Sequence, residues 1–157
     1  MGAGIVTRDT DGGSRMRVLG ESEWRAFLME GTRTGKLATV RSDGSAHVTP
    51  IWFVLDDEGR IVFTSATTTV KGRNLRRDPR ASLCVDDERP PFAFVRIDGE
   101  VTLDEDLRSM RRWATAIGGR YMGADRAAEF GRRNAVAGEM LVRLAPAHVV
   151  ARGGVSD

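Results

Sequence analysis

Short apolar segments separated by tight turns fill the first two thirds of this sequence, and this pattern constrains the fold most. Asp43-Gly44 lies between the apolar segments 36–40 and 46–55, and an Asp-Gly pair in that setting is a strong signal for a β-hairpin. A bulge or bend is expected at Asp98-Gly99, within a longer apolar segment. The full set of expected antiparallel strands is 36–40, 46–55, 61–65, 81–85, 92–103, 139–144 and 148–152, the last two on either side of Pro146.

Three helical segments accompany these strands, besides the short helix expected in the basic segment described below. The first lies between Ser22, a candidate N-cap, and Gly31. Residues 104–117 predict an amphipathic helix that Gly118-Gly119 is expected to end, and 124–136 predict a more polar helix. Short strands joined by tight turns, with helices at the edges, indicate an α+β fold built on an antiparallel barrel.

Length and composition agree with one globular domain. The chain has 157 residues, of which 41% are hydrophobic and 29% charged, as in ordinary globular proteins. Residues 1–17 are expected to form a mobile tail before a single domain at 18–157. No apolar run approaches the ~20 residues that a membrane span needs, so no membrane partner is expected. Cys84 is the only cysteine, which excludes an internal disulfide and favours the cytoplasm.

The positive charge of the chain is concentrated in one segment. Residues 71–80 contain five basic side chains and one acidic side chain, so they carry +4, while the whole chain carries +2. This basic segment follows a strand and the three threonines 67–69, where a helix is expected to begin. Hydroxyl groups, free backbone N–H groups and cations that converge at a helix N-terminus bind anions, most often phosphate. A nucleic-acid partner is not expected, because the charge is local.

Three segments of the sequence resemble a known family. HVTPIWF (47–53), TTTVKGRNLRRDPRASLCVDD (67–87) and FVRIDGEV (94–101), in this order after an Asp-Gly hairpin, resemble the split β-barrel flavin and deazaflavin oxidoreductases, the superfamily of pyridoxamine 5′-phosphate oxidase. The pattern is most similar to the actinobacterial branch that uses the deazaflavin coenzyme F420. The resemblance covers roughly residues 24–150. It implies an α+β split antiparallel β-barrel, the FMN-binding split barrel, with peripheral helices.

The resemblance also implies a cofactor that carries a phosphate. Four polar residues of the basic segment and the turn before it are the candidates for binding this phosphate: Thr68, Thr69, Lys71 and Asn74. Arg73 either binds the same group or points outward. Three later arginines are interpreted as partners of the helix dipole or as solvated charges: Arg76, Arg77 and Arg80.

By the same resemblance, the flat ring of the cofactor lies on the second strand. Six consecutive residues are the candidates for this ring slot: His47, Val48, Thr49, Pro50, Ile51 and Trp52. Pro50 has no N–H and fits a strand edge or bulge, where the ladder opens. Trp52 is equally compatible with packing in the core. His47 is placed at the cofactor edge or at the surface, with a general acid as the alternative role.

The resemblance implies a longer basic groove in the F420 branch, because F420 carries an oligoglutamate tail beyond its phosphate, whereas FMN ends at the phosphate. Five cations are the candidates for such a groove: Lys36, Arg41, Lys71, Arg73 and Arg77. Pyridoxamine phosphate is not the expected substrate, because the C-terminal Arg and His residues lack the arrangement that clamps it in the true oxidases.

No side chain is assigned to catalysis and no metal site is expected, because neither a nucleophile with its base nor a metal-ligand spacing occurs. The chemistry is therefore expected from the cofactor. The resemblance implies an F420-dependent oxidoreductase that transfers a hydride between reduced deazaflavin and a small organic acceptor bound over the ring face. The alternatives are an FMN-binding oxidoreductase and a non-catalytic carrier or sensor of flavin, deazaflavin or haem. Two barrels pack face to face in this family, which implies a homodimer with the cofactor at the interface.

Overall fold

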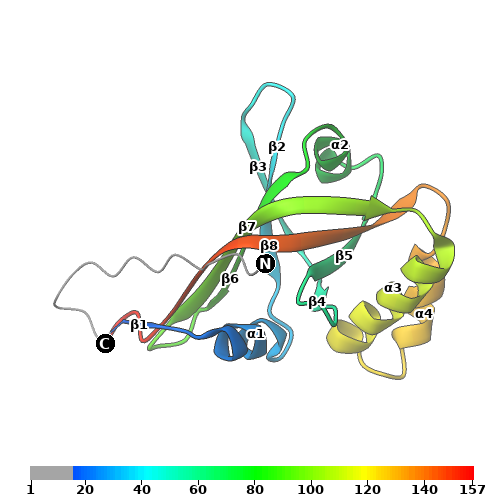
Figure 1. Ribbon diagram of the computed structural model, residues 1–157. Coiled ribbons are helices and arrows are strands. Elements are labelled where there is room, and N and C mark those ends of the chain that lie inside the picture. The colour runs from blue at the N-terminus through cyan, green and yellow to red at the C-terminus, as the bar shows by residue number, and fades with distance from the viewer. Residues whose placement is uncertain (1–15) are drawn as a thin grey trace.

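The computed structural model describes residues 16–157 (Figure 1). Most of the tail predicted over 1–17 therefore lies outside the described residues. Its last residue, Arg17, belongs to a short strand, β1 (Arg17–Val18), which pairs with Gly153 and Arg152 of the last strand.

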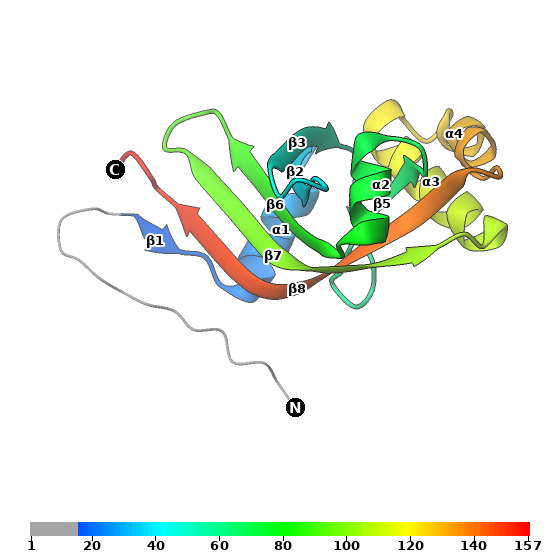
Figure 2. The ribbon, with the colours of Figure 1, turned by 90° about the horizontal axis from the view of Figure 1, so that it is seen from above.

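One curled antiparallel sheet forms the body of the protein. The strands that follow β1 are β2 (Gly35–Val40), β3 (Ala46–Ile51), β4 (Val54–Leu55), β5 (Ile61–Ala66), β6 (Arg80–Asp87), β7 (Ala93–Asp104) and β8 (Glu139–Gly153). Their order in the sheet is β3-β2-β6-β7-β8-β5-β4, with β1 beside β8. Seen from above, β7 and β8 run side by side along the molecule (Figure 2). Among the described strands, β3 and β4 at the two ends of this order do not pair with each other, so the barrel is split, as predicted.

Two strand predictions need correction. The segments 139–144 and 148–152 form one continuous strand, β8, because Pro146 lies opposite Gly99, where the pairing of β7 and β8 shifts at Asp98-Gly99. A bulge tolerates the missing N–H of proline, and the bulge itself is confirmed. The predicted strand 46–55 is instead interrupted at Trp52-Phe53 and divides into β3 and β4.

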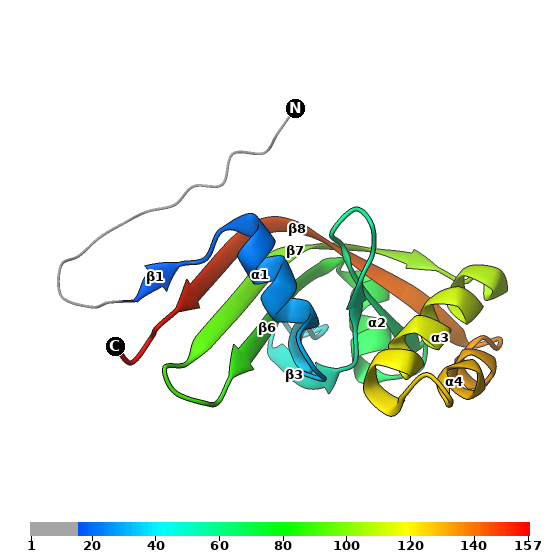
Figure 3. The same cartoon turned by 90° about the horizontal axis from the view of Figure 1, so that it is seen from below.

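The described part of the chain has four helices: α1 (Glu21–Met29), α2 (Val70–Arg77), α3 (Leu107–Met122) and α4 (Ala127–Asn134). In the view from below, α1 crosses the underside of the sheet, and α3 and α4 lie together at one end (Figure 3). None of these helices has the length and apolar character needed to cross a membrane.

Two buried clusters join the helices to the sheet. The larger cluster lies within the curl of the sheet and joins Leu28 of α1 to Phe63 of β5, both fully buried. The smaller cluster joins Leu141 of β8 to Met110 and Ile117 of α3. The apolar stripe predicted for residues 104–117 therefore packs on its own sheet. Burial of each large apolar side chain stabilises the fold by about 1.5–3 kcal/mol.

The start of α1 differs from the prediction. Gly20, not Ser22, is the N-cap residue, and the Oε2 atom of Glu23 accepts a hydrogen bond from the N–H of Gly20 at 2.8 Å. The Glu23 carboxylate thus satisfies the backbone N–H of Gly20, which would otherwise depend on water.

The glycine pair expected to end α3 lies inside this helix. A Cβ atom on Gly118 would lie 2.5 Å from the Cβ of Phe130 in α4, whereas one on Gly119 would meet its nearest neighbour, the Cβ of Ala127, at 3.4 Å. Gly118 therefore allows α4 to pack closely on α3. This packing explains why a helix retains a residue that costs about 1 kcal/mol relative to alanine.

These two glycines allow a matched test. We expect Gly118→Ala to lower the free energy of unfolding by about 1–3 kcal/mol, because the new methyl group overpacks the contact with Phe130. Gly119→Ala is expected to be neutral or stabilising by up to about 1 kcal/mol. Urea unfolding measures the free energy of unfolding of both variants. Equal changes in the two variants would contradict close packing at Gly118.

Candidate functional site

The turn between β5 and α2 is organised by Thr69. Its side chain is the N-cap of α2, because Oγ1 accepts a hydrogen bond from the N–H of Gly72 at 3.1 Å and donates to the carbonyl of Ala66 at 2.9 Å. The same oxygen lies 3.0 Å from the Oγ of Ser65. The Thr69 hydroxyl thus shapes the turn, and Thr68 is the exposed residue among the three threonines.

Lys71 lies in the first turn of α2 and is half-buried. Its ammonium group has no hydrogen bond and no ion pair within 4 Å among residues 16–157. Burial lowers the pKa of Lys71, while the charge of Glu139 acts to raise it. Lys71 is therefore a cation with unused donors at a helix N-terminus, as a phosphate site requires.

Glu139 is a site residue that the sequence analysis missed. It begins β8 and pairs with Ala66 of β5, directly before the threonine turn. Burial raises the pKa of the Glu139 carboxyl, while Lys71 and Arg133 of α4 lower it. One carboxylate thus lies close to two cations from different helices. The sequence holds no signal for this arrangement, because it depends on the register of β5 and β8.

The remaining cations of the basic segment are occupied within the protein. Arg73 donates to the carbonyl of Thr68 at 2.9 Å, so its side chain folds back over the turn. Arg76 pairs with Glu105 at 2.6 Å, and Arg80 pairs with Asp78 at 2.7 Å. The last pair holds the pKa of Asp78 at about 2. These exposed ion pairs agree with the interpretation of Arg76 and Arg80 as solvated surface charges.

Asn74, a candidate for the phosphate site, is buried and bonded within the protein. Its side chain is 4% exposed, and Nδ2 donates to the Oγ1 of Thr39 in β2 at 3.0 Å, while Oδ1 accepts from Arg77 at 3.0 Å. Both ends of the amide are thus used inside the protein. Asn74 thus anchors α2 to β2, and the contact with Thr39 uses one of the two hydrogens on Nδ2. Arg77, which also donates to the carbonyl of Val40, belongs to this anchor.

Lys36 and Arg41 of the predicted tail groove also have protein partners. Lys36 pairs with Asp86 at 3.0 Å, and Arg41 donates to the carbonyl of Ala46. Of the five cations proposed for that groove, Lys71 is the one without such a contact within the described residues.

The predicted ring slot lies on β3, which is an edge strand. Its residues pair with β2 on one side only, so alternate backbone N–H and C=O groups face outward. Pro50 sits on this edge, as its missing N–H predicts. Val48 is 62% exposed, whereas Ile51 is buried in the core at 6%. The exposed face of β3 therefore carries apolar side chains, including Val48 and Pro50. The outer edge of β3 carries backbone groups that pair with no described strand.

His47 and Thr49 face the other side of β3. His47 lies opposite Thr39, and Thr49 lies opposite the buried Leu37. The Nδ1 atom of His47 is buried and has no hydrogen-bond partner among the described residues. Because Asn74 holds Thr39, this arrangement places His47 beside α2.

Trp52 follows the end of β3 and is 39% exposed. Its ring stacks on Tyr121 of α3, with 5.0 Å between ring centroids and 3° between planes, and it lies 5.8 Å from the tilted ring of Phe130. One part of Trp52 therefore packs on aromatic side chains, while another part is open. The contacts of Tyr121 with this strand were not foreseen, because the helix was expected to end at Gly118-Gly119, before Tyr121.

These features fit a phosphate-bearing, flat cofactor. The turn around Lys71 offers a hydroxyl, a helix N-terminus and an ammonium group without a partner among the described residues, while the edge of β3 offers backbone donors and acceptors beside apolar side chains. A largely apolar slot with a few polar groups is what a ring system needs. Asn74 and Thr39 hold the two parts together.

The structure predicts that Asn74 matters for stability. Asn74→Ala is expected to lower the free energy of unfolding by about 1–3 kcal/mol, because it leaves a buried hydrogen-bond partner unsatisfied. Arg73→Ala, one residue away and exposed, should stay within about 0.5 kcal/mol of wild type. Denaturant unfolding measures both. Equal stability of the two variants would show that Asn74 does not anchor α2.

Several solved protein structures are similar to this one. The conserved hypothetical protein Rv2991 from Mycobacterium tuberculosis is 26% identical, with a TM-score of 0.77 over 88% of each chain. An F420 reductase is also 26% identical, with a TM-score of 0.62 over 79% of this chain and 94% of that protein. The heme storage protein HutZ from Vibrio cholerae, at 22% identity and a TM-score of 0.68 over 87% of this chain and 98% of that chain, shares the fold.

A family model gives the assignment. The model described as pyridoxamine 5′-phosphate oxidase matches residues 21–152, which span β2 to β7, all four helices and nearly all of β8. This range contains the threonine turn, the basic segment and the edge strand β3. The chain therefore belongs to the pyridoxamine 5′-phosphate oxidase family and has its split-barrel fold.

Proposed function

We propose that this protein is an oxidoreductase that binds coenzyme F420 and transfers a hydride between the reduced deazaflavin and a small organic acceptor, with FMN as the alternative cofactor. The observation that carries the proposal is the half-buried Lys71 at the start of α2, whose ammonium group has no hydrogen bond or ion pair within residues 16–157. The F420 reductase among the similar structures supports the deazaflavin over FMN. The cytoplasm is part of the proposal, because the single cysteine forms no internal disulfide.

The residues of this chain would divide the binding between them. Lys71 would hold the phosphate by a charge-assisted hydrogen bond, with the Thr68 hydroxyl and the N-terminus of α2 beside it. The outward backbone groups of β3 would bind the polar edge of the ring, and Val48, Pro50 and Trp52 would exclude water from its face. When bound, the flavin or deazaflavin supplies the group that gives or takes a hydride.

A carrier or sensor protein is the second candidate. The groups described at the candidate site, which are the Lys71 ammonium group, the N-terminus of α2 and the edge of β3, bind and enclose a ligand, and a carrier requires these as much as an enzyme does. Oxidation of the reduced cofactor by a quinone or an unsaturated lactone, measured by its absorbance, separates the two candidates. Turnover of a tightly bound cofactor identifies an enzyme, whereas binding without turnover with any acceptor favours the carrier.

Lys71→Gln tests the phosphate site directly. We expect this variant to bind F420, or FMN, about tenfold to a hundredfold more weakly in a fluorescence titration, because it loses one charge-assisted contact of about 1.5–3 kcal/mol. Arg73→Gln is the control, since the Arg73 side chain binds the Thr68 carbonyl. Equal weakening in both variants, or no weakening in Lys71→Gln, would contradict the assignment.

The same titration has an expected pH dependence. The ammonium form of Lys71 binds phosphate, so affinity is constant while Lys71 is protonated and falls as the pH rises through its pKa. Burial lowers this pKa below the ordinary 10.5, so the decline begins at a lower pH than for a free lysine. Lys71→Gln should lack this decline.

The protein is also proposed to be a homodimer that closes the ring slot. The slot residues lie on an open surface, with Val48 62% and Trp52 39% exposed, and a buried cofactor ring needs a second wall. An apolar depression of about 280 Å³ continues this surface across β2 and β6, lined among others by Ala38 and Ala81. A second copy would cover both.

Val48→Arg tests this interface. Wild type should sediment at twice the 17.2 kDa of one chain, and Val48→Arg should shift the equilibrium toward monomer, because it buries a charge in an apolar contact. Leu107→Arg changes an equally apolar, 50% exposed residue on α3 and should leave the dimer intact. A monomeric wild-type protein would refute the shared site.

A further inference from the structure

The break between β3 and β4 depends on two residues of α3. Phe53, which lies in this break, is fully buried. Its N–H donates to the hydroxyl of Tyr121 at 3.3 Å, and its carbonyl accepts from Nη1 of Arg120 at 2.7 Å. The side chains of Arg120 and Tyr121 thus satisfy both polar backbone groups of Phe53, which lies between β3 and β4 and outside both strands. Buried backbone groups need such partners.

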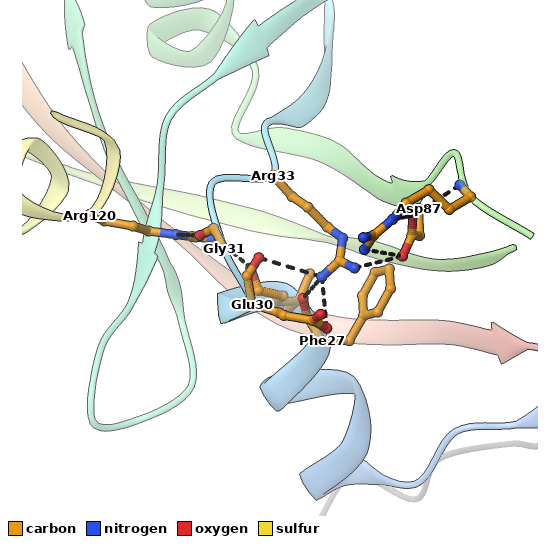
Figure 4. A network of polar contacts seen from close by, with 8 residues as sticks. Phe27, Glu30, Gly31, Arg33, Asp87 and Arg120 are labelled. Atoms are coloured by element: carbon orange, nitrogen blue, oxygen red, sulfur yellow. Dashed lines mark hydrogen bonds and ion pairs between the residues drawn. The ribbon is translucent and has the colours of Figure 1, made fainter. Parts of the chain in front are cut away.

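Arg120 and Tyr121 are themselves fixed to the end of α1. Nη2 of Arg120 donates to the carbonyl of Leu28 at 2.7 Å, and Nε donates to the carbonyl of Gly31 at 3.1 Å. The hydroxyl of Tyr121 donates to the carbonyl of Arg33 at 2.7 Å. Figure 4 shows the side chain of Arg120 pointing toward Gly31, which follows α1. The half-buried guanidinium therefore serves as the cation at the C-terminus of α1, where carbonyl groups favour one.

The segment after α1, which accepts these hydrogen bonds, is itself held in place by contacts of the Arg33 side chain. The guanidinium of Arg33 lies 4.2 Å from the centroid of the Phe27 ring, pairs with Asp87 of β6 at 2.8 Å and donates to the carbonyl of Phe27 at 3.0 Å (Figure 4). Its side chain is 13% exposed. The contacts of Arg120 and Tyr121 therefore connect the strand break to α1 and to the sheet at once.

The consequence for the candidate site lies in Trp52. The ring of Tyr121 stacks on its indole at 5.0 Å with 3° between planes, so the orientation of the indole follows that of Tyr121. Trp52 keeps 39% of its surface exposed at the end of β3. A fixed aromatic surface loses little conformational entropy when a flat ligand packs against it.

We propose that Arg120 and Tyr121 are positioning residues: they fix the break between β3 and β4 and thereby hold the Trp52 indole as a wall of the ring slot. This inference rests on the proposed function. Neither residue is required to touch the cofactor, because each acts through Phe53 or Trp52.

The positioning is measurable without any cofactor. Full-length protein labelled with 5-fluorotryptophan gives three fluorine resonances, from Trp24, Trp52 and Trp113, and Trp52→Phe assigns one of them. We expect Tyr121→Leu to shift or broaden the Trp52 resonance, and Tyr121→Phe, which keeps the ring but not the hydroxyl, to do so less. Arg112→Gln is the control, because Arg112 also lies on α3 but over the ring of Trp113, at 4.9 Å. It should leave the Trp52 resonance unchanged.

Cofactor titration of the same variants tests the consequence. Tyr121→Leu should bind F420, or FMN, about threefold to tenfold more weakly, as expected for one lost aromatic contact, while Arg112→Gln binds like wild type. An unchanged Trp52 resonance in Tyr121→Leu would overturn the proposal, as would a changed resonance with unchanged affinity. If Tyr121→Leu fails to fold, the same two readouts of Tyr121→Phe decide. Wild type that binds neither cofactor refutes the proposed function, whereas the resonance alone still decides whether Tyr121 positions Trp52.

Discussion

The ladder between β7 and β8 is the constraint on which the rest of the structure depends. These two strands pair from Ala93 and Gly153 at one end to Asp104 and Leu141 at the other. One end carries β1, and the other end faces α3 through Leu141. Pro146 has no N–H to donate to β7. The shift of pairing at Asp98-Gly99 nevertheless lets both halves of β8 pair with β7. β8 continues to Glu139, where its register with β5 sets which carboxylate lies beside the threonine turn.

The local elements were predictable because local patterns determine them. Asp43-Gly44 forms its turn, Asp98-Gly99 forms its bulge, and α2 begins where the threonines end. The errors have tertiary causes. Gly118-Gly119 does not end α3, because close packing of α4 on Gly118 outweighs the low helix propensity of glycine. The N-cap of α1 moved to Gly20 because Glu23 supplies the acceptor.

The candidate site shows the same limit. The family resemblance identified the basic segment and β3, but it could not say which polar groups are already used. Thr69 and Asn74 have the residue types of a phosphate site, yet their side chains build the turn and anchor α2. Lys71 is distinguished only by the partners that it lacks within the described residues. Glu139 and Tyr121 reach the site from distant parts of the chain, so the sequence alone could not place them.

A crystal structure of the protein with F420 bound tests the central claim most directly. The account predicts that a phosphate oxygen lies about 3 Å from the Nζ of Lys71, with the ring against the edge of β3 and beside Trp52. A cofactor found elsewhere would contradict it, for example in the groove of about 870 Å³ between α1 and the turn from β6 to β7, which Phe27 and Phe92 line. A phosphate bound without contact to Lys71 would contradict it as well.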